Sequence, residues 1–465
     1  FDYIGPQMKP STTITARSSL TDELRQFFVI ALPLSAAYLA EFAMFITTKM
    51  VVGKLGYQSL AAVGIAGDLS FEVLVILMAM LSIVGVLGAQ AHGGGRHDEL
   101  GRAIRQGFLV GLGIGLPAML LIWNLDLFMT ITGQDTLVVE LAQDFLTGLS
   151  PAVLPILWFA VLRNFVAVMS RTLPVLVVTS AAVLVNYLLT LWFVHGGFGL
   201  PAMGLFGAGL SITLVSWLMF AALAWHIWRQ PLYRGYGIFS GKWRLHIATC
   251  REIVVLGLPV AGLAFLEAGL FVATAILSGI IGAKTLAAYE IVIAWAGIPF
   301  VIAFGLAEAT MIRVAHAVGR EDAAERRRAG LMGMGLVLAI LSGMLFVPLM
   351  FADEIIRIFI TPADPGFAEV SALASRFLAI SAIFLLFDGL QAAAARALRG
   401  MKDNLVPLWI AGFGYWVLGI GGGALLAFHF ELGGIGLWFG LAAGLAVAAC
   451  LLTLRFHLLT RLDRA

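Results

Sequence analysis

Long apolar runs separated by short polar connectors occupy this chain from about residue 25 onward. A helix crosses about 30 Å of hydrocarbon with about 20 mainly apolar residues, and twelve runs meet that requirement. They cover residues 25–50, 57–86, 103–125, 137–162, 173–195, 203–228, 252–281, 286–312, 329–351, 368–394, 404–429 and 433–456. The pattern predicts an all-α integral membrane protein with twelve transmembrane helices.

Composition supports the same class. Of 465 residues, 61% are hydrophobic and 12% are charged, whereas soluble domains carry about 25% charged residues. The mean hydropathy of +0.98 excludes a soluble globular protein, because so few charges cannot cover its surface. A polar tail, residues 1–20, precedes the first run, and Thr21 followed by Asp22 and Glu23 favours a helix start there.

The distribution of basic residues predicts the orientation. If the N-terminus is inside, 24 Lys and Arg residues fall on the inner side, 4 fall on the outer side, and Arg376 lies within a run. The positive-inside rule then places both termini in the cytoplasm, and we expect a multi-pass protein of the cytoplasmic (inner) membrane. The basic residues form no single stripe of the kind that binds nucleic acid, so no nucleic-acid partner is expected.

The longest polar connector divides the chain into two blocks of six runs. The sequence RQPLYRGYGIFSGKWRLHIATCR, residues 229–251, carries several positive charges. The predicted organisation is a tail at 1–20, a first six-helix lobe at 21–229, an inter-lobe linker at 230–251 and a second six-helix lobe at 252–465.

The two blocks are an internal repeat. An offset of 226 aligns Pro33 with Pro259, Glu41 with Glu267 and, beyond the second run, a glycine with a glycine, without a gap over about 70 residues. Six spans per repeat imply a pseudo-two-fold axis along the membrane normal. We expect two pseudo-symmetric bundles that enclose a central cleft and work by alternating access.

Acids within the runs are candidate functional residues, because a charge in hydrocarbon costs about 2.5 to 3.5 kcal/mol on insertion scales. Glu41 lies near the middle of the first run, Glu267 is its repeat equivalent, and Asp388 lies midway along the tenth. No basic residue lies within one turn of Asp388. Glu267 and Asp388 must therefore be protonated, bound to a cation or paired between lobes. The alternative is a purely structural hydrogen bond in a helix interface.

Further acids are weaker candidates for the cleft. Asp68 and Glu72 lie four residues apart in the second run, and Glu290 lies near the start of the eighth. Lys49 ends the first run, where it could reach the headgroups or neutralise an acid of the cleft. No HExxH or paired-cysteine motif occurs, so neither a structural metal nor any cofactor is expected.

Several segments together resemble the multidrug and toxic compound extrusion (MATE) transporters, and most of all their NorM-like branch. They include MVVGKLGYQSLAAVGIA, LRNFVAVMSRTLPVLV, LGLPVAGLAFLEAGLF, KTLAAYEI, IRVAHAVGRED and FDGLQAAAARALRGMKDN. The resemblance covers essentially the whole chain. It implies an antiporter that exports amphipathic, often cationic drugs while Na⁺ or H⁺ enters.

The resemblance also assigns residues. The family's cation site in the second lobe falls on Glu267 and Asp388. Thr48 stands where the family usually has an aspartate in the first lobe, which leaves Glu41, Asn186 and Thr48 as a possible polar site there. Phe384 stands one turn before Asp388, where relatives can offer a tyrosine hydroxyl. The residues leave the choice between Na⁺ and H⁺ open.

Two other functions remain as alternatives. A lipid or polysaccharide-precursor flippase of the same superfamily would be expected to have a more basic cavity. A polytopic membrane transferase could use His92, His97 and Asp98 as acid and base groups at the inner surface. The internal repeat disfavours a transferase, because a catalytic centre needs no second copy of its scaffold. We therefore predict a non-enzymatic transporter that works as a monomer in the bilayer on small organic molecules.

Overall fold

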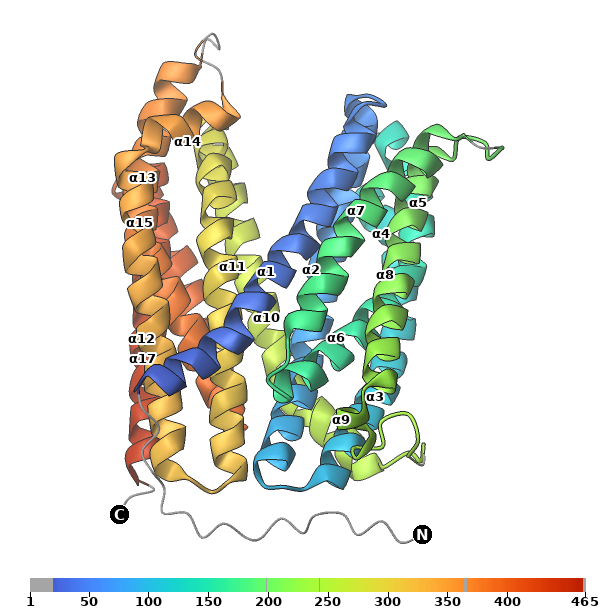
Figure 1. Ribbon diagram of the computed structural model, residues 1–465. Helices are drawn as coiled ribbons and strands as arrows, with labels where there is room; N and C mark the ends of the chain where they lie inside the picture. The colour runs from blue at the N-terminus through green and yellow to red at the C-terminus, as the bar shows by residue number, and fades with distance from the viewer. Residues whose placement is uncertain (1–19, 198, 242, 361, 363–365, 463–465) are drawn as a thin grey trace, which may run out of the picture.

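A computed structural model describes residues 20–197, 199–241, 243–360, 362 and 366–462 of the chain, and their regular secondary structure is helical (Figure 1). These residues contain no strand, only an isolated antiparallel bridge between Gly197 and Leu200. Twelve helical segments of the described chain are long and apolar enough to cross a membrane, which confirms the predicted number. Residues 1–19 of the predicted polar tail lie outside the described residues.

The first lobe, as we use the term below, runs from α1 to α8. Its elements are α1 (Leu20–Gly53), α2 (Tyr57–Gly93), α3 (His97–Trp123), α4 (Leu125–Ile131), α5 (Thr136–Leu149), η1 (Ser150–Ala152), α6 (Val153–Val168), α7 (Leu173–His195) and α8 (Gly204–Arg229). The short 3₁₀-helix η1 contains Pro151 and separates α5 from α6, because proline lacks the N–H that a continuous α-helix needs.

The second lobe runs from α10 to α17, and α9 (Pro231–Arg234) lies in the linker between the lobes. Its elements are α10 (Ile247–Ile281), α11 (Ala283–Gly319), α12 (Ala323–Met344), α13 (Phe346–Met350), α14 (Ala352–Phe359), α15 (Phe367–Gly400), α16 (Leu405–Gly412), η2 (Phe413–Gly422), η3 (Leu425–His429) and α17 (Gly434–Leu462). Both η2 and η3 are π-helices, so the predicted span 404–429 is not a plain α-helix.

The two lobes meet at one end of the molecule and diverge toward the other (Figure 1). We refer to the end at which α1 begins and α17 ends as the basic end, because its connectors carry Arg96, Arg171, Arg320 and Lys402. The opposite end is the far end. Contacts between the lobes are made by α1 with α11 and by α2 with α10 and α11.

Helices α2 and α11 are longer than the predicted spans. Each has 37 residues, which corresponds to about 55 Å at about 1.5 Å per residue, well beyond the hydrocarbon thickness of about 30 Å. The spans predicted from hydropathy end at residues 86 and 312, because the residues in the last turns of both helices are polar or small. These last turns form the contact between the lobes at the basic end.

That contact is pseudo-symmetric. A Cβ added at Gly93 of α2 would overlap the carbonyl oxygen of His316, and a Cβ added at Gly319 of α11 would overlap that of Gln90. The offset of 226 relates Gly93 to Gly319 and Gln90 to His316. Glycine is needed at both positions because only backbones without a side chain can approach so closely. We refer to these residues as the glycine seam.

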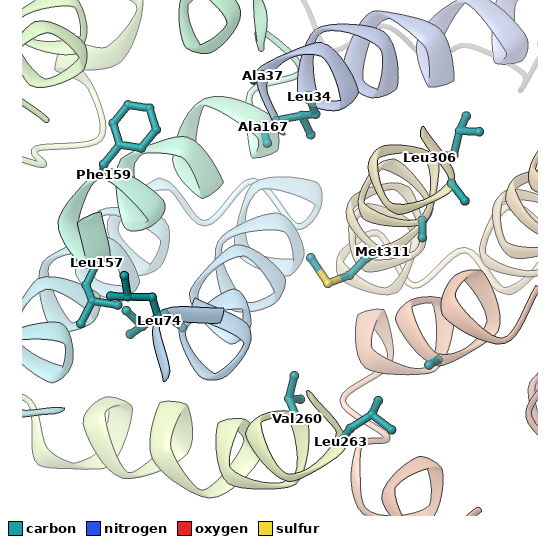
Figure 2. Packing of buried hydrophobic residues seen from close by; sticks show 14 of the residues in the cluster. Leu34, Ala37, Leu74, Leu157, Phe159, Ala167, Val260, Leu263, Leu306 and Met311 are labelled. Atoms are coloured by element: carbon teal, nitrogen blue, oxygen red, sulfur yellow. The ribbon is translucent and has the colours of Figure 1, made fainter. Parts of the chain in front are cut away.

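Buried apolar side chains fill the junction between the lobes above this seam. Figure 2 labels Leu34 of α1, Val260 and Leu263 of α10, and Leu306 and Met311 of α11, which all belong to one cluster of buried hydrophobic residues. Lipid tails are as apolar as leucine, so the hydrophobic effect does not drive helices together inside a membrane. Close van der Waals packing of this kind holds them together instead. The junction therefore owes its stability to shape complementarity.

Candidate functional site

Asp388 lies in the middle of α15, which packs against α11, α12 and α17. The residue is only 2% exposed, and its Oδ1 atom has no hydrogen-bond partner among the described residues. Gln391, one turn further along the helix, is within hydrogen-bonding reach of the carboxyl group. An ionised carboxylate has room for about four hydrogen-bond or metal contacts, so this acceptor is free to take a proton or a cation.

Glu267 lies on α10, eight residues after Pro259. It is half-buried, and within the described chain it makes neither an ion pair nor a hydrogen bond. It interacts electrostatically with Asp388 of α15 and with the hydroxyl of Tyr415. The structure thus brings the two predicted acids of the second lobe into one electrostatic cluster, with no basic partner bound to either of them in the described residues.

Tyr415 is held beside these acids by the π-helix η2. It is fully buried, and its hydroxyl donates to Oε1 of Gln391 over 2.8 Å. Glycines allow η2 to lie directly on α17, since a Cβ added at Gly444 would overlap the carbonyl oxygen of Gly414. Single π-helical turns occur often at functional sites, and here the π-helix aims the tyrosine at the acid cluster.

Phe384 does not contribute an oxygen to this cluster. Its ring packs edge-on against Trp438 and Phe271, with centroids 5.6 and 6.3 Å away. It is fully buried and belongs to the core of the second lobe. The hydroxyl that the sequence lacks at this position is present nearby on Tyr415, at a different place in the chain.

The three weaker candidates also lie between the lobes. Glu72 of α2 interacts electrostatically with Glu267 and with Asp68, and Glu290 of α11 interacts with Asp68. Lys49 forms an ion pair with Asp68, 2.7 Å from Nζ to Oδ1. This ion pair agrees with the interpretation in which Lys49 neutralises an acid, rather than the one in which it reaches the lipid headgroups. Electrostatic interactions therefore link acids of both lobes, from Glu290 and Asp68 through Glu72 to Glu267.

Two of the three predicted polar residues of the first lobe are bonded to each other, and the third has a different partner. Asn186 Nδ2 of α7 donates to Thr48 Oγ1 of α1 over 3.0 Å, and Thr48 Oγ1 donates to the carbonyl oxygen of Met44. Thr48 and Asn186 are both fully buried, and Asn186 Oδ1 has no partner among the described residues. Glu41 is held in an ion pair.

Arg163 of α6 binds both oxygens of Glu41, with Nη1 to Oε1 at 2.8 Å and Nη1 to Oε2 at 3.0 Å. Its guanidinium also lies over the Tyr38 ring, 4.6 Å from the centroid. A cation in contact with an aromatic face is attracted to the ring electrons, so two interactions hold Arg163 beside Glu41. Although Glu41 and Glu267 are equivalent in the repeat, only Glu41 has a basic partner within the described residues.

A second buried pair stands opposite the first. Arg396 Nε of α15 donates to Glu308 Oε1 of α11 over 2.9 Å, and its guanidinium lies over the Phe304 ring, 3.9 Å from the centroid. The rings of Tyr38 and Phe304 meet edge to face between the lobes, with centroids 5.0 Å apart. Each lobe therefore contributes one ion pair and one aromatic ring to their junction.

A cavity of about 70 Å³ adjoins the first of these pairs. It lies within the first lobe, between α1, α2, α6 and α8, and half of its lining residues are methionine or phenylalanine. It is lined by Glu41, Met44, Phe45, Phe71, Leu74, Met78, Ile156, Phe159, Arg163, Ile212, Ser216 and Met219. Flexible thioethers and flat rings can repack around ligands of different shape, and Glu41 offers a negative group at one side.

Sequence reasoning missed Gln391, Tyr415, Arg163 and Arg396. Gln391 could have been found, because it lies one turn after Asp388 on the same helix. The other three depend on contacts between distant segments. His92, a candidate of the transferase alternative, packs beside His316 and Tyr236 at the basic end. No group of three or more His, Cys, Asp or Glu in the described residues is arranged to hold a metal ion.

Comparison with known sequences gives a consistent result. The MatE family profile matches residues 33–192 and 259–425. A protein of Bradyrhizobium diazoefficiens named "Probable multidrug resistance protein NorM" is 36% identical over 461 residues, covering 99% of this chain and 98% of its own length. A protein of the same name from Pseudomonas aeruginosa is 38% identical over 437 residues, covering 94% of this chain and 89% of its own.

Solved structures share the fold. A eukaryotic MATE transporter superposes with a TM-score of 0.84 at 22% identity, covering 96% of this chain and 98% of its own. An outward-facing multidrug resistance MATE family transporter of the MOP superfamily has a TM-score of 0.85 at 17% identity, covering 95% and 97%. A MOP superfamily transporter from Pyrococcus furiosus, whose binding pocket is described as reversed in polarity, has a TM-score of 0.84 at 17% identity, covering 95% and 97%.

Proposed function

Because the chain belongs to the MatE family, it is a transporter rather than an enzyme, and we propose that it exports amphipathic, often cationic organic compounds in exchange for inward H⁺ or Na⁺. The names of its relatives support multidrug efflux. Exchange of this kind needs no cofactor and no covalent step. One chain suffices, because it supplies both lobes, and we propose that it works as a monomer.

The proposed location is the inner membrane, with the basic end in the cytoplasm. Connectors at that end carry most of the lysines and arginines, as the positive-inside rule requires. In this orientation the far end, where the lobes diverge (Figure 1), faces outward. The glycine seam then closes the cytoplasmic side, and rocking of the lobes about their junction would expose the site to each side in turn.

The observation that carries this proposal is the unpaired state of Glu267 and Asp388. Glu41 and Glu308, which also lie near the lobe junction, are each bound to an arginine. The guanidinium groups of Arg396 and Arg399 act electrostatically on Glu267 but form no ion pair with it in the described residues. A carboxylate that is shielded from water and lacks an ion-pair partner favours uptake of a cation, either a proton or a metal ion. We propose that the coupling ion binds these two acids, with Gln391 and Tyr415 as their neighbours in the cluster.

Electrostatic interaction between the bound ion and the drug provides the coupling. A cation bound at Glu267 removes negative charge between the lobes, which weakens the attraction for a cationic drug and changes the preferred arrangement of the lobes. Asp68, Glu72 and Glu290 extend the negative region and would concentrate cations of either kind before binding. This acidic lining favours export of cations over the flippase alternative, for which a basic cavity is expected.

The proposed drug site is the cavity beside Glu41. Its 70 Å³ is smaller than the roughly 300–1,000 Å³ of drug sites, so binding requires the methionines to move. Methionine has three rotatable bonds and adapts to irregular shapes. We therefore propose that the first lobe accepts the apolar part of the drug, while the second lobe binds the coupling ion.

The test is drug-driven cation flux in proteoliposomes. Proteoliposomes that contain the wild-type protein are loaded with a fluorescent organic cation such as ethidium. A Na⁺ gradient or a pH gradient is then applied, each alone. Whichever gradient drives ethidium movement identifies the coupling ion. Glu267→Gln and Asp388→Asn are each expected to abolish gradient-driven movement of ethidium. A neutral amide neither takes up a proton nor supplies the negative charge that binds Na⁺.

Exposed acids of α14 supply matched controls. Asp353→Asn and Glu354→Gln make the same chemical changes at the far end, where both residues are exposed and neither has an ion pair in the described chain. They are expected to leave exchange unchanged. If Glu267→Gln and Asp388→Asn both exchange ethidium like the wild type, the assignment of the coupling site is wrong. If no organic cation moves under either gradient in the wild type, the proposed function is wrong.

A further inference from the structure

A second cavity, at the basic end of the molecule, lies outside the proposed transport site. It has a volume of about 730 Å³ and lies where the end of α8 meets the linker, in the size range of about 300–1,000 Å³ that suits a ligand. It is lined by Ile227, Trp228, Arg229, Tyr233, Arg234, Ile238, Phe239 and Ser240. The lining combines two guanidinium groups with apolar and aromatic walls.

The charge of this cavity is uncompensated. Neither Arg229 nor Arg234 has an ion pair among the described residues, and no acid lines the cavity. Arg171, from the connector after α6, interacts electrostatically with the hydroxyl of Tyr233 in the cavity wall. The sequence contains no Asp or Glu at all between Asp144 and Glu252. Guanidinium groups without a carboxylate partner are the side chains that most often bind phosphate.

The linker that forms the cavity is fixed to the first lobe. Arg105 of α3 donates to the carbonyl oxygen of Gly237, and Gln106 donates to that of Arg244 over 2.9 Å. The Tyr233 ring packs against Phe165 of α6, with centroids 5.2 Å apart. A binding site of this kind needs little ordering when its ligand arrives, which preserves affinity.

The surroundings place the cavity at the level of the lipid headgroups. Trp225 and Trp228, in the last two turns of α8, are 54% and 59% exposed, and exposed tryptophans typically mark the boundary between hydrocarbon and water. Leu232 beside them is also exposed. The Arg229 guanidinium lies 4.7 Å from the Trp225 ring centroid, at the same level. The arginines therefore face headgroups, while the apolar walls lie beside acyl chains.

We propose that this cavity binds the headgroup of an anionic phospholipid, with its phosphate on Arg229 and Arg234. Basic pockets at the cytoplasmic ends of membrane helices are suited to such lipids. A free phosphate would use the same guanidinium groups, but the exposed tryptophans and the apolar walls have no role in holding it. The inference needs only that the helices span a membrane, so it does not depend on the transported compound or the coupling ion.

The test uses the purified full chain in a neutral detergent. Phosphatidylglycerol, phosphatidylcholine with the same acyl chains, or inorganic phosphate is added, and bound lipid is counted by native mass spectrometry while the melting temperature is followed. The expected result is retention of one phosphatidylglycerol and a higher melting temperature, because a ligand of the folded state stabilises it. Phosphatidylcholine and inorganic phosphate are expected to do neither.

Two variants locate the lipid. Arg229→Gln combined with Arg234→Gln is expected to weaken phosphatidylglycerol binding by roughly tenfold or more, the effect of losing charge-assisted hydrogen bonds. The control, Arg244→Gln combined with Arg461→Gln, removes the same charge from exposed positions outside the cavity and is expected to bind like the wild type. Ser240→Asp keeps both arginines but adds a carboxylate to the lining, and the same loss is expected.

Three outcomes would overturn the inference. Equal binding of phosphatidylglycerol and phosphatidylcholine would show that charge plays no part. Full binding by both the arginine variant and Ser240→Asp would place the lipid elsewhere. Stabilisation by inorganic phosphate that equals the stabilisation by phosphatidylglycerol would make the cavity an anion site open to water. Transport by any of these variants is a separate measurement, so failure here leaves the proposed antiport standing.

Discussion

At the scale of single residues, a buried carboxylate near the lobe junction is set apart by whether an arginine reaches it. Glu41 and Glu267 are repeat equivalents, yet Arg163 binds the first and no basic side chain in the described residues binds the second. The same scaffold position is thus a fixed ion pair in one lobe and an open acid in the other. Conversion of one into the other needs only an arginine on a facing helix.

The buried pair gives a first prediction. Arg163→Met leaves Glu41 without a counter-charge and is expected to lower the free energy of unfolding by about 3–5 kcal/mol, the cost of breaking a buried pair. Glu41→Leu in the same chain is expected to recover most of that loss, because the unpaired charge is gone. Unfolding of the detergent-solubilised variants, followed by circular dichroism, measures both values.

An exposed pair provides the comparison. Arg96 and Glu99, 2.8 Å apart, have half-exposed side chains, and Arg96→Met is expected to cost no more than about 1 kcal/mol. If Arg163→Met costs as little as Arg96→Met, or if the added Glu41→Leu recovers nothing, Arg163 and Glu41 are not coupled as the distances indicate.

Tyr415 gives a second prediction. Tyr415→Phe removes the hydroxyl that donates to Gln391 and leaves the buried Oε1 of Gln391 without that donor. An unsatisfied buried acceptor costs about 1–3 kcal/mol of free energy. The half-saturating concentration of the coupling ion is expected to change by roughly fivefold or more, since about 1.4 kcal/mol is a factor of ten. The control is Tyr187→Phe, which removes the hydroxyl of an exposed tyrosine on α7. An ion dependence identical in all three proteins would exclude Tyr415 from the cluster.

The sequence predicted some of this site and not the rest, for a physical reason. Glu267 and Asp388 stand out because a charge in an apolar run is rare and costly. The grouping of Glu41 with Thr48 and Asn186 rested on the family resemblance, and in the structure Thr48 and Asn186 bond each other while Glu41 binds Arg163. Partners such as Arg163 lie on a helix more than a hundred residues away, and hydropathy carries no information about which helix faces face each other.

At the scale of elements, irregular helices position the cluster. The predicted span 404–429 has the length and apolarity of an ordinary helix, and the structure divides it into α16, η2 and η3. Its many glycines weaken the preference for regular α-helix and let η2 lie against the glycines of α17. Hydropathy predicts that a span exists, whereas its helix type depends on the neighbour it packs against.

The glycine seam gives a third prediction. Gly319→Val places a branched side chain against the backbone at Gln90, so the basic end can no longer close as it does here. The variant is expected to favour an arrangement with the basic end open. Distances between spin labels on α2 and α11 at that end, measured by electron paramagnetic resonance, are expected to lengthen relative to the wild type.

Gly335→Val is the matched control for the seam. A Cβ at Gly335 of α12 meets no atom within 4 Å, so Gly335→Val introduces the same side chain without affecting the contact between the lobes. If the two variants give the same distance distribution, the glycine seam does not hold the basic end closed.

At the scale of the whole molecule, a symmetric scaffold holds an asymmetric distribution of chemistry. The unpaired acids belong to the second lobe, while the methionine-rich cavity belongs to the first. The two lobes are joined at the junction, where Ser35 Oγ donates to the Ile302 carbonyl oxygen over 3.3 Å and Arg399 donates to Ser82 Oγ over 3.1 Å. Rocking must break these bonds, so occupancy of either lobe can influence the other through them.

This division of labour predicts separable losses. Met219→Phe enlarges a side chain that lines the cavity of the first lobe and is expected to weaken drug binding by roughly tenfold, with an overpacking cost of about 1–3 kcal/mol in stability. Met334→Phe makes the same change at a buried position of the second lobe and controls for that cost.

Glu267→Gln is expected to do the reverse of Met219→Phe, abolishing ion binding while the variant still binds drug at a fixed ion concentration. Binding of drug and ion is measured separately by isothermal titration in detergent. A common site would make each variant lose both ligands together, whereas two sites joined only through the lobe junction leave one ligand bound in each.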